Sequence, residues 1–371
     1  MSGHVRQRGN KGQWYAVINV VENGKRKRQW YRLACGTKKE AEVECAKLIA
    51  KQADGALVEP SKRTVTEWVR ARIDQWEAAA DISARTAQRY RQLLDNQIAL
   101  IGTKPIQKLT RLDVEGWHTA LRKTGLAART IGHAHRVLGK ALRDAEKDNI
   151  VAKNATRLQR APKVTDEEMV IVRDVPALVE KLAGFRLRIP AMVALFTGMR
   201  LGEILALRWT RVDLDRGAIQ VREALEQTRA HGVRFKSAKT RAGRRDITLP
   251  DILVEALREH RKAALELRMH LGAGRLPDDA LLFATVEGEP LSSNAQSAAW
   301  ADFANSIGMP DVTFHALRHT HASQLIDAGV DIVTISKRLG HAKPDITLRI
   351  YAHLFRNDDS KAAAAINAAF R

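Results

Sequence analysis

The sequence predicts a multidomain protein that is mainly α-helical and carries small β-sheets. Residues 1–62 combine a hairpin pattern with one helix, residues 63–162 repeat apolar residues at helical spacing, and the remainder mixes helices with short strands. The formal net charge of +20 is uneven, with +7 in residues 1–62, +9 in residues 63–160 and +4 in the rest. A chain of 371 residues is long enough for two or three domains. The basic first part indicates a polyanionic partner.

The first 62 residues are expected to form a small sheet backed by a helix. Residues 13–20 are rich in aromatic and β-branched types, and Asn23-Gly24 is a strong signal for a two-residue hairpin loop. Thr37-Lys38-Lys39-Glu40 has the spacing of a capping box, which predicts a helix through about Lys51. The return strand contains four consecutive basic residues: Lys25, Arg26, Lys27 and Arg28. These four residues either contact a nucleic acid or form an ordinary solvated hairpin.

A linker and a helical region follow. Residues 54–62 are typical of a linker, and from Thr64 to about Lys153 apolar residues recur at the spacing of amphipathic helices. Helix starts are predicted near Ser83 and after residues 125–131. Four arginines of these helices are candidate phosphate contacts: Arg85, Arg89, Arg129 and Arg136. A second linker is predicted at residues 162–168.

The last part of the chain is expected to mix helices with one small antiparallel sheet. Residues 189–196 are apolar and helical, Thr197-Gly198 breaks the helix, and it resumes at Leu201. The strands of the sheet are predicted at residues 218–221, 233–236 and 245–250. Further helix signals are a Thr313 cap, Gly340 as a helix end, Pro344-Asp345 as a helix start, and a terminal helix over residues 362–370.

Five residues of this last part suggest phosphodiester chemistry. An arginine offers a planar fork that matches two phosphate oxygens, which favours phosphate binding by Arg200 and Arg318. Residues three and four positions apart share one helix face, so His315 points the same way as Arg318. His341 can donate to a phosphate oxygen, and Tyr351 can act as a covalent nucleophile. Glu203 is expected to brace Arg200. We expect three further histidines to be structural: His319, His321 and His353.

The ordered motifs resemble those of the tyrosine recombinases, specifically the integrases of temperate phages and integrative elements. The motifs are Thr197 to Glu203, His315 to His319, Leu339 to His341, and Tyr351. The resemblance implies an N-terminal arm-type DNA-binding domain (1–62), a helical core-binding domain (63–162) and a mixed α+β catalytic domain (163–371). It also implies a hairpin lysine that protonates the leaving 5′ oxygen. Lys239 matches that position best, and Lys236 is the competitor.

The implied activity is site-specific DNA recombination. The enzyme would cut and rejoin strands through a 3′-phosphotyrosine intermediate, and so integrate and excise a phage genome or mobile element, without a metal, ATP or other cofactor. The implied partners are double-stranded attachment sites of core and arm type. A homotetramer on DNA, a DNA-bending host factor and a directionality factor are implied as well.

Three alternatives are weaker. A type IB topoisomerase shares this chemistry but relaxes DNA as a monomer, and the separate basic N-terminal region favours an integrase. A zinc enzyme would need a carboxylate or cysteine cluster beside the histidines, and His315-Ala-Leu-Arg-His319 lacks the glutamate of a His-Glu-x-x-His helix. A non-catalytic DNA-binding regulator has no use for Tyr351.

The remaining signals concern location. Cys35 and Cys45 are too few for a disulfide framework, and we expect buried thiols in a reducing compartment. The N-terminal residues lack an apolar signal segment, and no stretch is apolar enough to span a membrane. We therefore expect a soluble protein of the bacterial host cytoplasm, associated with the nucleoid.

Overall fold

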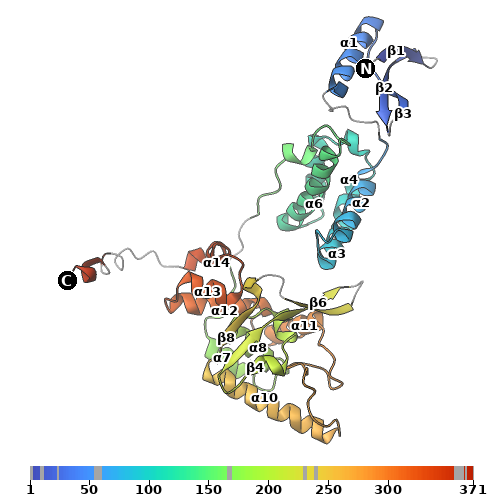
Figure 1. The fold of residues 1–371 in the computed structure, drawn as a ribbon. Coiled ribbons are helices and arrows are strands. Elements are labelled where there is room, and N and C mark those ends of the chain that lie inside the picture. The colour runs from blue at the N-terminus through green and yellow to red at the C-terminus, as the bar shows by residue number, and fades with distance from the viewer. Residues whose placement is uncertain are drawn as a thin grey trace. The chain divides into compact units, whose positions relative to one another are not determined.

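The chain forms two compact units, residues 1–166 and residues 167–371, each described here by itself (Figure 1). The computed structural model describes residues 3–8, 12–22, 25–53, 61–164, 169–228, 232–237, 241–354, 363 and 366–370. The architecture is mainly helical with small antiparallel sheets, which confirms the predicted fold class. Within the described residues, no helix has the length and apolar character needed to cross a membrane.

The first unit begins with a three-stranded antiparallel sheet in the order β1-β2-β3 and one helix. Its elements are β1 (Gly3–Arg8), β2 (Gln13–Glu22), β3 (Lys25–Arg32) and α1 (Lys38–Ala53). Strand β1 was not predicted from the sequence, because its polar residues carry no strand pattern of their own and it is held by pairing with β2. Glu22 pairs with Lys25, and Asn23-Gly24 lies outside the described residues. The predicted capping box at Thr37 and Glu40 is confirmed, since each side chain bonds the other's backbone N–H at 3.3 Å.

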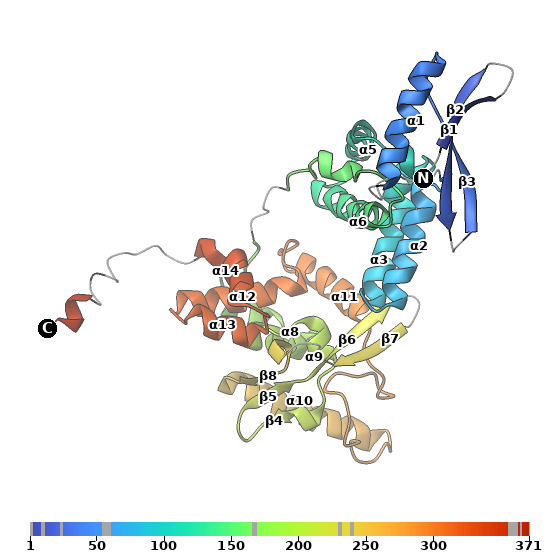
Figure 2. The same cartoon turned by 45° about the horizontal axis from the view of Figure 1, so that its top comes forward.

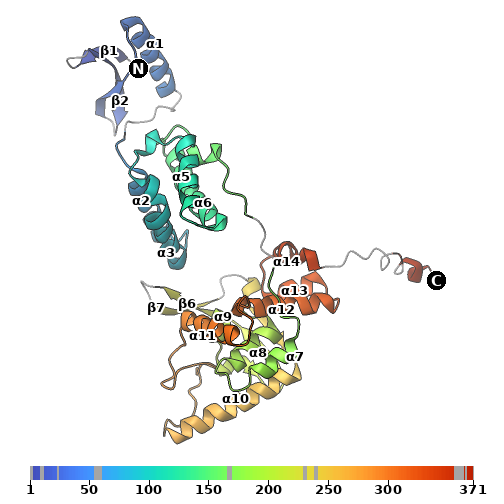
Figure 3. The same ribbon diagram turned by 180° about the vertical axis from the view of Figure 1, so that it is seen from behind.

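The rest of the first unit is helical. Its helices are α2 (Val65–Ala78), α3 (Ala84–Leu93), α4 (Ala99–Gly102), α5 (Arg111–Lys123) and α6 (Ala128–Lys147), with a π-helical segment at residues 94–98 between α3 and α4. Helices α2 and α3 lie beside α5 and α6 (Figure 3). The apolar positions predicted from helical spacing are buried there, among them Trp68, Ile73 and Leu138. The four candidate arginines of α3 and α6 are exposed: Arg85, Arg89, Arg129 and Arg136.

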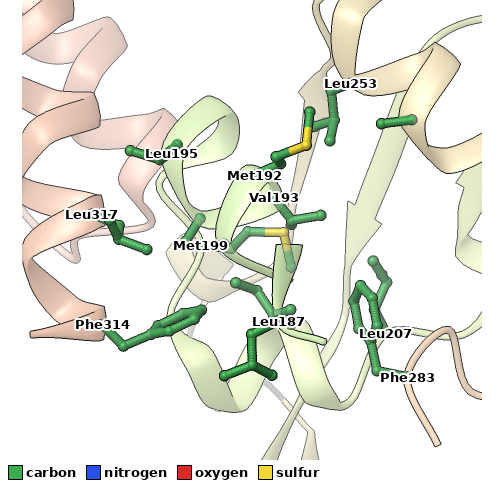
Figure 4. Close-up of a cluster of buried hydrophobic side chains, with 14 of the residues drawn as sticks. Leu187, Met192, Val193, Leu195, Met199, Leu207, Leu253, Phe283, Phe314 and Leu317 are labelled. Carbon is green, nitrogen blue, oxygen red and sulfur yellow. The ribbon is translucent and has the colours of Figure 1, made fainter. Parts of the chain in front are cut away.

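The second unit is built around α8. Its elements are α7 (Val175–Lys181), α8 (Arg188–Thr197), α9 (Leu201–Leu205), β4 (Val212–Asp213), β5 (Ala218–Val221), β6 (Glu223–Thr228), β7 (Gly232–Ser237), β8 (Arg245–Thr248), α10 (Asp251–His270), α11 (Ser293–Ser306), α12 (Phe314–Asp327), α13 (Ile332–Leu339) and α14 (Pro344–Tyr351). Figure 4 shows Met192, Val193 and Leu195 of α8 between Leu317 of α12 and Leu253 of α10. This cluster is the main hydrophobic core of the unit.

The strands of the second unit differ from the prediction in one respect. Strands β5 and β8 pair as expected, with β4 on the other side of β5. Residues 233–236, however, do not join that sheet, because β7 pairs with β6 in a separate two-stranded sheet. Arg222 lies between β5 and β6, and its guanidinium donates to Asp246 Oδ1 at 2.6 Å. Strands β5 and β6 are therefore neighbours in the chain but belong to different sheets.

Two left-handed glycines end helices as the sequence predicted. Gly198 (φ +68°) ends α8, and Gly340 (φ +70°) ends α13. Thr313 caps α12, since its hydroxyl accepts from the N–H of Ala316 at 3.2 Å. Pro344 opens α14, which ends at Tyr351. Helices α12, α13 and α14 lie together at one side of the second unit (Figure 2).

Two buried histidines contact each other in the helical part of the first unit. His118 of α5 and His135 of α6 are 2% and 8% exposed, and the distance between His118 Nε2 and His135 Nδ1 is 3.1 Å. Burial, with a contribution from His135, lowers the pKa of His118 to about 4. Both rings are therefore neutral at neutral pH, and one N–H serves the pair.

Acid should loosen α5 and α6 through this pair. An unfolded histidine takes up a proton near pH 6.5 and folded His118 only near pH 4, so its stabilisation is complete above pH 6.5 and is lost as the pH falls to about 4. The free energy of opening of α5 and α6 should fall by about 3 kcal/mol over this range. Amide hydrogen exchange of the two helices measures this free energy, once the rate at each pH is corrected for the intrinsic exchange rate. His118→Gln should show a much smaller pH dependence, and equal behaviour of variant and wild type would contradict this account.

Replacing Gly340 should disturb the end of α13 more than a matched glycine elsewhere. A Cβ on Gly340 would lie 2.7 Å from Arg245 Nη1 and 3.2 Å from the carbonyl oxygen of Ala242, whereas a Cβ on Gly329 (φ +76°) would meet nothing within 4 Å. Gly329→Ala should cost only the left-handed strain of about 1 kcal/mol. Gly340→Ala should cost about 1–3 kcal/mol more from overpacking. Urea unfolding measures both, and equal losses would show that Arg245 simply moves aside.

Candidate active site

Arg200 stands at the break between α8 and α9. Its backbone is extended (φ −75°, ψ 149°), and its N–H donates to Glu203 Oε2 at 3.0 Å. Its Nη1 donates to Glu203 Oε1 at 2.9 Å, while 43% of its side chain stays exposed. The brace expected from the spacing Arg200 to Glu203 is therefore present in the geometry. Arg200 lines a pocket of about 570 Å³.

Glu203 is buried between two arginines. Besides Arg200 it accepts from Arg245 of β8, with Arg245 Nη2 at 2.8 Å from Oε2. Burial raises the pKa of Glu203, but the hydrogen bond from Arg245 and the charges of Arg245 and Arg200 outweigh it, so that the pKa lies below its usual value. Glu203 is thus a carboxylate that fixes two guanidinium groups.

Arg318 lies almost completely buried between two helix ends. It is 2% exposed, and it donates to the carbonyl oxygens of Gly198 at 2.5 Å and of Leu339 at 2.7 Å. Burial, together with the charge of Arg200, lowers the pKa of Arg318 to about 9, which leaves it charged at neutral pH. Helix C-termini carry partial negative charge, so two of them form a suitable seat for a buried cation.

His341 follows Gly340 and contacts Arg318. Its Nε2 lies 3.0 Å from Arg318 Nη2, and its Nδ1 lies 2.7 Å from Thr347 Oγ1. A guanidinium only donates, so Nε2 accepts and Nδ1 carries the proton. Burial and the charge of Arg318 lower the pKa of His341 to about 4. The sequence suggested that His341 donates to a phosphate, whereas in this structure the nitrogen facing Arg318 is an acceptor.

Tyr351 is buried and its hydroxyl meets His319. The ring is 1% exposed in an apolar cluster between α12 and α13, made by Ala322, Ile326, Ile335 and Leu339. Tyr351 Oη lies 2.9 Å from His319 Nδ1. Burial raises the pKa of Tyr351 to about 12, so the phenol is protonated and donates to the imidazole. Residues Ile346 and Ile350 of the same helix line the pocket that contains Arg200.

His319 makes a contact with Tyr351 that the sequence did not predict. It was expected to be structural, and His315 was expected to share a helix face with Arg318. His315 lines the pocket with Arg200 and Arg318, and its ring centroid lies 4.8 Å from that of His319. The four-residue spacing in α12 places both on one face and was the available signal. Burial lowers the pKa of His319 to about 4.

Neither His321 nor His353 lines this pocket. His321 is buried, with its Nδ1 2.8 Å from the carbonyl oxygen of Leu195 and its Nε2 accepting from Arg338 at 3.0 Å. His353 is exposed after α14. Within the described residues, no group of three or more histidine, cysteine, aspartate or glutamate side chains lies close enough to hold a metal ion.

The two lysine candidates differ in what the structure describes. Lys236 of β7 lines the pocket, and its Nζ is 3.1 Å from Glu226 Oε1. Lys239 lies outside the described residues, as do the side chains of Lys25, Arg26 and Lys27. Arg28 of β3 is exposed. The choice of lysine and the N-terminal DNA contacts therefore stay predictions.

Two solved integrase structures have a similar fold. The integrase of the Tn1549 transposon, in complex with a circular intermediate DNA, matches with a TM-score of 0.69 at 19% identity, covering 83% of this chain and 100% of that one. A lambda integrase tetramer bound to a Holliday junction matches with a TM-score of 0.54 at 18% identity, covering 92% of both chains.

Curated relatives and a family model agree with this fold. A tyrosine recombinase XerC-like protein of Caldanaerobacter subterraneus is 27% identical over 299 residues, 76% of each chain. An integrase of Streptomyces ambofaciens is 26% identical over 389 residues, covering 99% of this chain and 98% of that one. The model of the phage integrase family matches residues 169–358, just over half of the chain and the whole of the site described above. The chain therefore belongs to the phage integrase family.

Proposed function

We propose that the pocket binds one scissile phosphate of duplex DNA and that Tyr351 attacks it. The observation that carries this proposal is the convergence of Arg200, Arg318, His315 and His341 on one pocket. The hydroxyl of Tyr351 contacts His319, whose ring in turn contacts that of His315. The pocket has an excess of positive charge, because the carboxylate of Glu203 balances only part of the charge of the three arginines beside it. A phosphodiester supplies a complementary anion.

Family membership makes the chain a site-specific DNA recombinase. It is an integrase that cuts and rejoins DNA strands through a 3′-phosphotyrosine, and so inserts and excises a mobile element or phage genome. The assignment of individual residues to the steps of this reaction is our proposal.

In the first step, Tyr351 Oη attacks phosphorus while the bond from phosphorus to the 5′ oxygen breaks. Arg200 and Arg318 stabilise the charge on the non-bridging oxygens of the pentacoordinate state, aided by His315 and His341. The phenol proton must leave, since the pKa of Tyr351 is about 12. We assign this proton to His319, because its Nδ1 contacts Tyr351 Oη. His315 lies one helical turn from His319 and is the next group that can take the proton.

The leaving 5′ oxygen needs a proton from a general acid. Lys239 remains our first choice, and Lys236 the alternative. The contact of Lys236 with Glu226 supports Lys239, because the ammonium of Lys236 already donates to a carboxylate. In the second step, the 5′ hydroxyl of the partner strand attacks the phosphotyrosine and releases Tyr351. One phosphodiester is exchanged for another, so the cycle consumes no ATP.

The domain roles and partners follow from the resemblance. We propose that residues 1–62 bind arm-type DNA, residues 63–162 bind core-type DNA and residues 163–371 carry the chemistry. We propose four protomers on two duplexes, a host DNA-bending factor, a directionality factor and a cytoplasmic, nucleoid-associated location. The exposure of Arg28 and of the four helix arginines supports the DNA-binding roles.

Tyr351→Phe should abolish the covalent adduct and leave DNA binding unchanged. The variant keeps the buried ring and loses one hydroxyl, which should cost about 1 kcal/mol of stability. The assay uses a nicked core-type duplex, selected by binding from a random pool, and detects adducts on a denaturing gel in excess EDTA. The matched control Tyr90→Phe should form adduct like wild type. An adduct with Tyr351→Phe would move the nucleophile elsewhere, and loss of wild-type adduct on chelation would point to a metal enzyme.

Neutralising the basic strand should weaken arm-type binding alone. Replacing Lys25, Arg26, Lys27 and Arg28 by Gln should flatten the salt dependence of arm-site affinity by roughly one unit of log–log slope for each lost phosphate contact. Core-site cleavage should persist, as it should after deletion of residues 1–62. Footprinting of arm DNA and filter binding at several salt concentrations measure this. An unchanged slope would show that these four residues do not contact the phosphates of arm-type DNA.

A further inference from the structure

Arg245 is a buried arginine beside the pocket, and the proposed mechanism gives it no role. Its side chain, on β8, is 6% exposed. It donates to Glu203 Oε2 at 2.8 Å and, through Nε, to the carbonyl oxygen of Arg338 at 2.7 Å. A longer contact of 3.5 Å joins its Nη1 to the carbonyl oxygen of Gly243. One guanidinium thus touches α9, the end of α13 and the turn before β8.

Each of these contacts leads to a group of the proposed site. Glu203 also holds Arg200, and the carbonyl of Arg338 lies three residues before His341. The turn at Gly243 follows the segment that contains Lys239. The contact with α13 is close, because even a Cβ on Gly340 would come within 2.7 Å of Arg245 Nη1.

We propose that Arg245 is a positioning residue for DNA cleavage, which holds Glu203, and with it Arg200, in register with the end of α13 that presents His341. The proposal rests on the proposed function of this pocket. Arg245 touches neither the phosphate nor Tyr351 in this role. It fixes the distance between Arg200, which Glu203 holds, and His341, which follows the end of α13.

The chemistry of the contacts requires an arginine. The donors to Glu203 and to the carbonyl of Arg338 come from different nitrogens of one rigid plane, Nη2 and Nε. A lysine has a single nitrogen and no fixed fork, so it keeps the charge but cannot span both acceptors in this geometry. Buried ion pairs add little net stability compared with apolar residues of the same size. The pairing of Arg245 with Glu203 is therefore better explained by the geometry that it imposes than by the stability that it adds.

The experiment separates geometry from charge with two variants and one control. Arg245→Lys keeps the charge and loses the fork, Arg245→Met loses both, and Arg258→Met removes an arginine from the exposed surface of α10. Adduct formation is measured in single turnovers at saturating core-type DNA, beside the dissociation constant for that DNA and urea unfolding. We expect cleavage at least tenfold slower with Lys and about 100-fold slower with Met, because small misplacements of a reacting group cost about that much. Binding should change less than threefold, and Arg258→Met should match wild type.

A second measurement needs no DNA. Burial and the charges of Arg318 and Arg200 lower the pKa of His341 most, and the charge of Arg245 lowers it further. NMR titration of His341 should therefore show a small rise of its pKa in Arg245→Met and a pKa near wild type in Arg245→Lys. Slow cleavage by a folded Arg245→Lys variant in which the pKa of His341 is unchanged supports a positioning role of the guanidinium of Arg245. Cleavage by that variant within twofold of wild type overturns it, as does an unshifted His341 in the Met variant. If Arg245→Met does not fold, the Lys variant decides. If wild type forms no adduct, the proposed function fails and the His341 titration still tests the coupling.

Discussion

The site depends on the buried guanidinium of Arg318, which joins two helix ends. Gly198 and Gly340 end α8 and α13 in the left-handed conformation, and the carbonyl oxygens of Gly198 and Leu339 accept from Arg318. The partial negative charge of both helix ends offsets the burial of a cation. Arg200 follows Gly198 by two residues and His341 follows Gly340 by one, so the same contact that seats Arg318 also places these two side chains. A left-handed glycine is needed at both ends because the chain must turn sharply around one guanidinium.

The same arrangement gathers positive charge around one carboxylate. Arg200, Arg245 and Arg318 lie near Glu203, and burial together with the neighbouring cations lowers the pKa of Arg318 to about 9 and that of His341 to about 4. Repulsion between these cations costs stability, and a bound anion would relieve it. Strain of this kind is expected where a binding site is prepared for a charged ligand. This arrangement of charge agrees with the proposal that the pocket binds a phosphate.

Much of this was predictable from the sequence, and the exceptions share a cause. Some features depend only on residues close together in the chain, and these could be predicted. They are the capping box at Thr37, the helix ends at Gly198 and Gly340, and α14. Strand β1 and the separate pairing of β6 with β7 depend on partners distant in the chain and were not predicted. In the site, single motifs identified the residues of the pocket, whereas the roles of His319 and Arg245 arise from contacts across 32 and 42 residues. Local patterns do not encode such pairings.

The protonation states of the histidines link DNA binding to the first chemical step. In the DNA-free protein, His341 Nε2 accepts from Arg318 and His319 Nδ1 accepts from Tyr351, so both imidazoles are neutral and neither nitrogen can donate. On the proposed mechanism, the phosphate becomes the acceptor for Arg318 and releases His341 Nε2. The added negative charge also raises the pKa of the imidazoles close to it. His341 can then take up a proton and donate to the phosphate, as the sequence suggested. His319 becomes a better acceptor for the phenol proton at the same moment. On this proposal the substrate supplies the basicity that Tyr351 needs, and the buried phenol, whose pKa is about 12, would stay unreactive until DNA is bound.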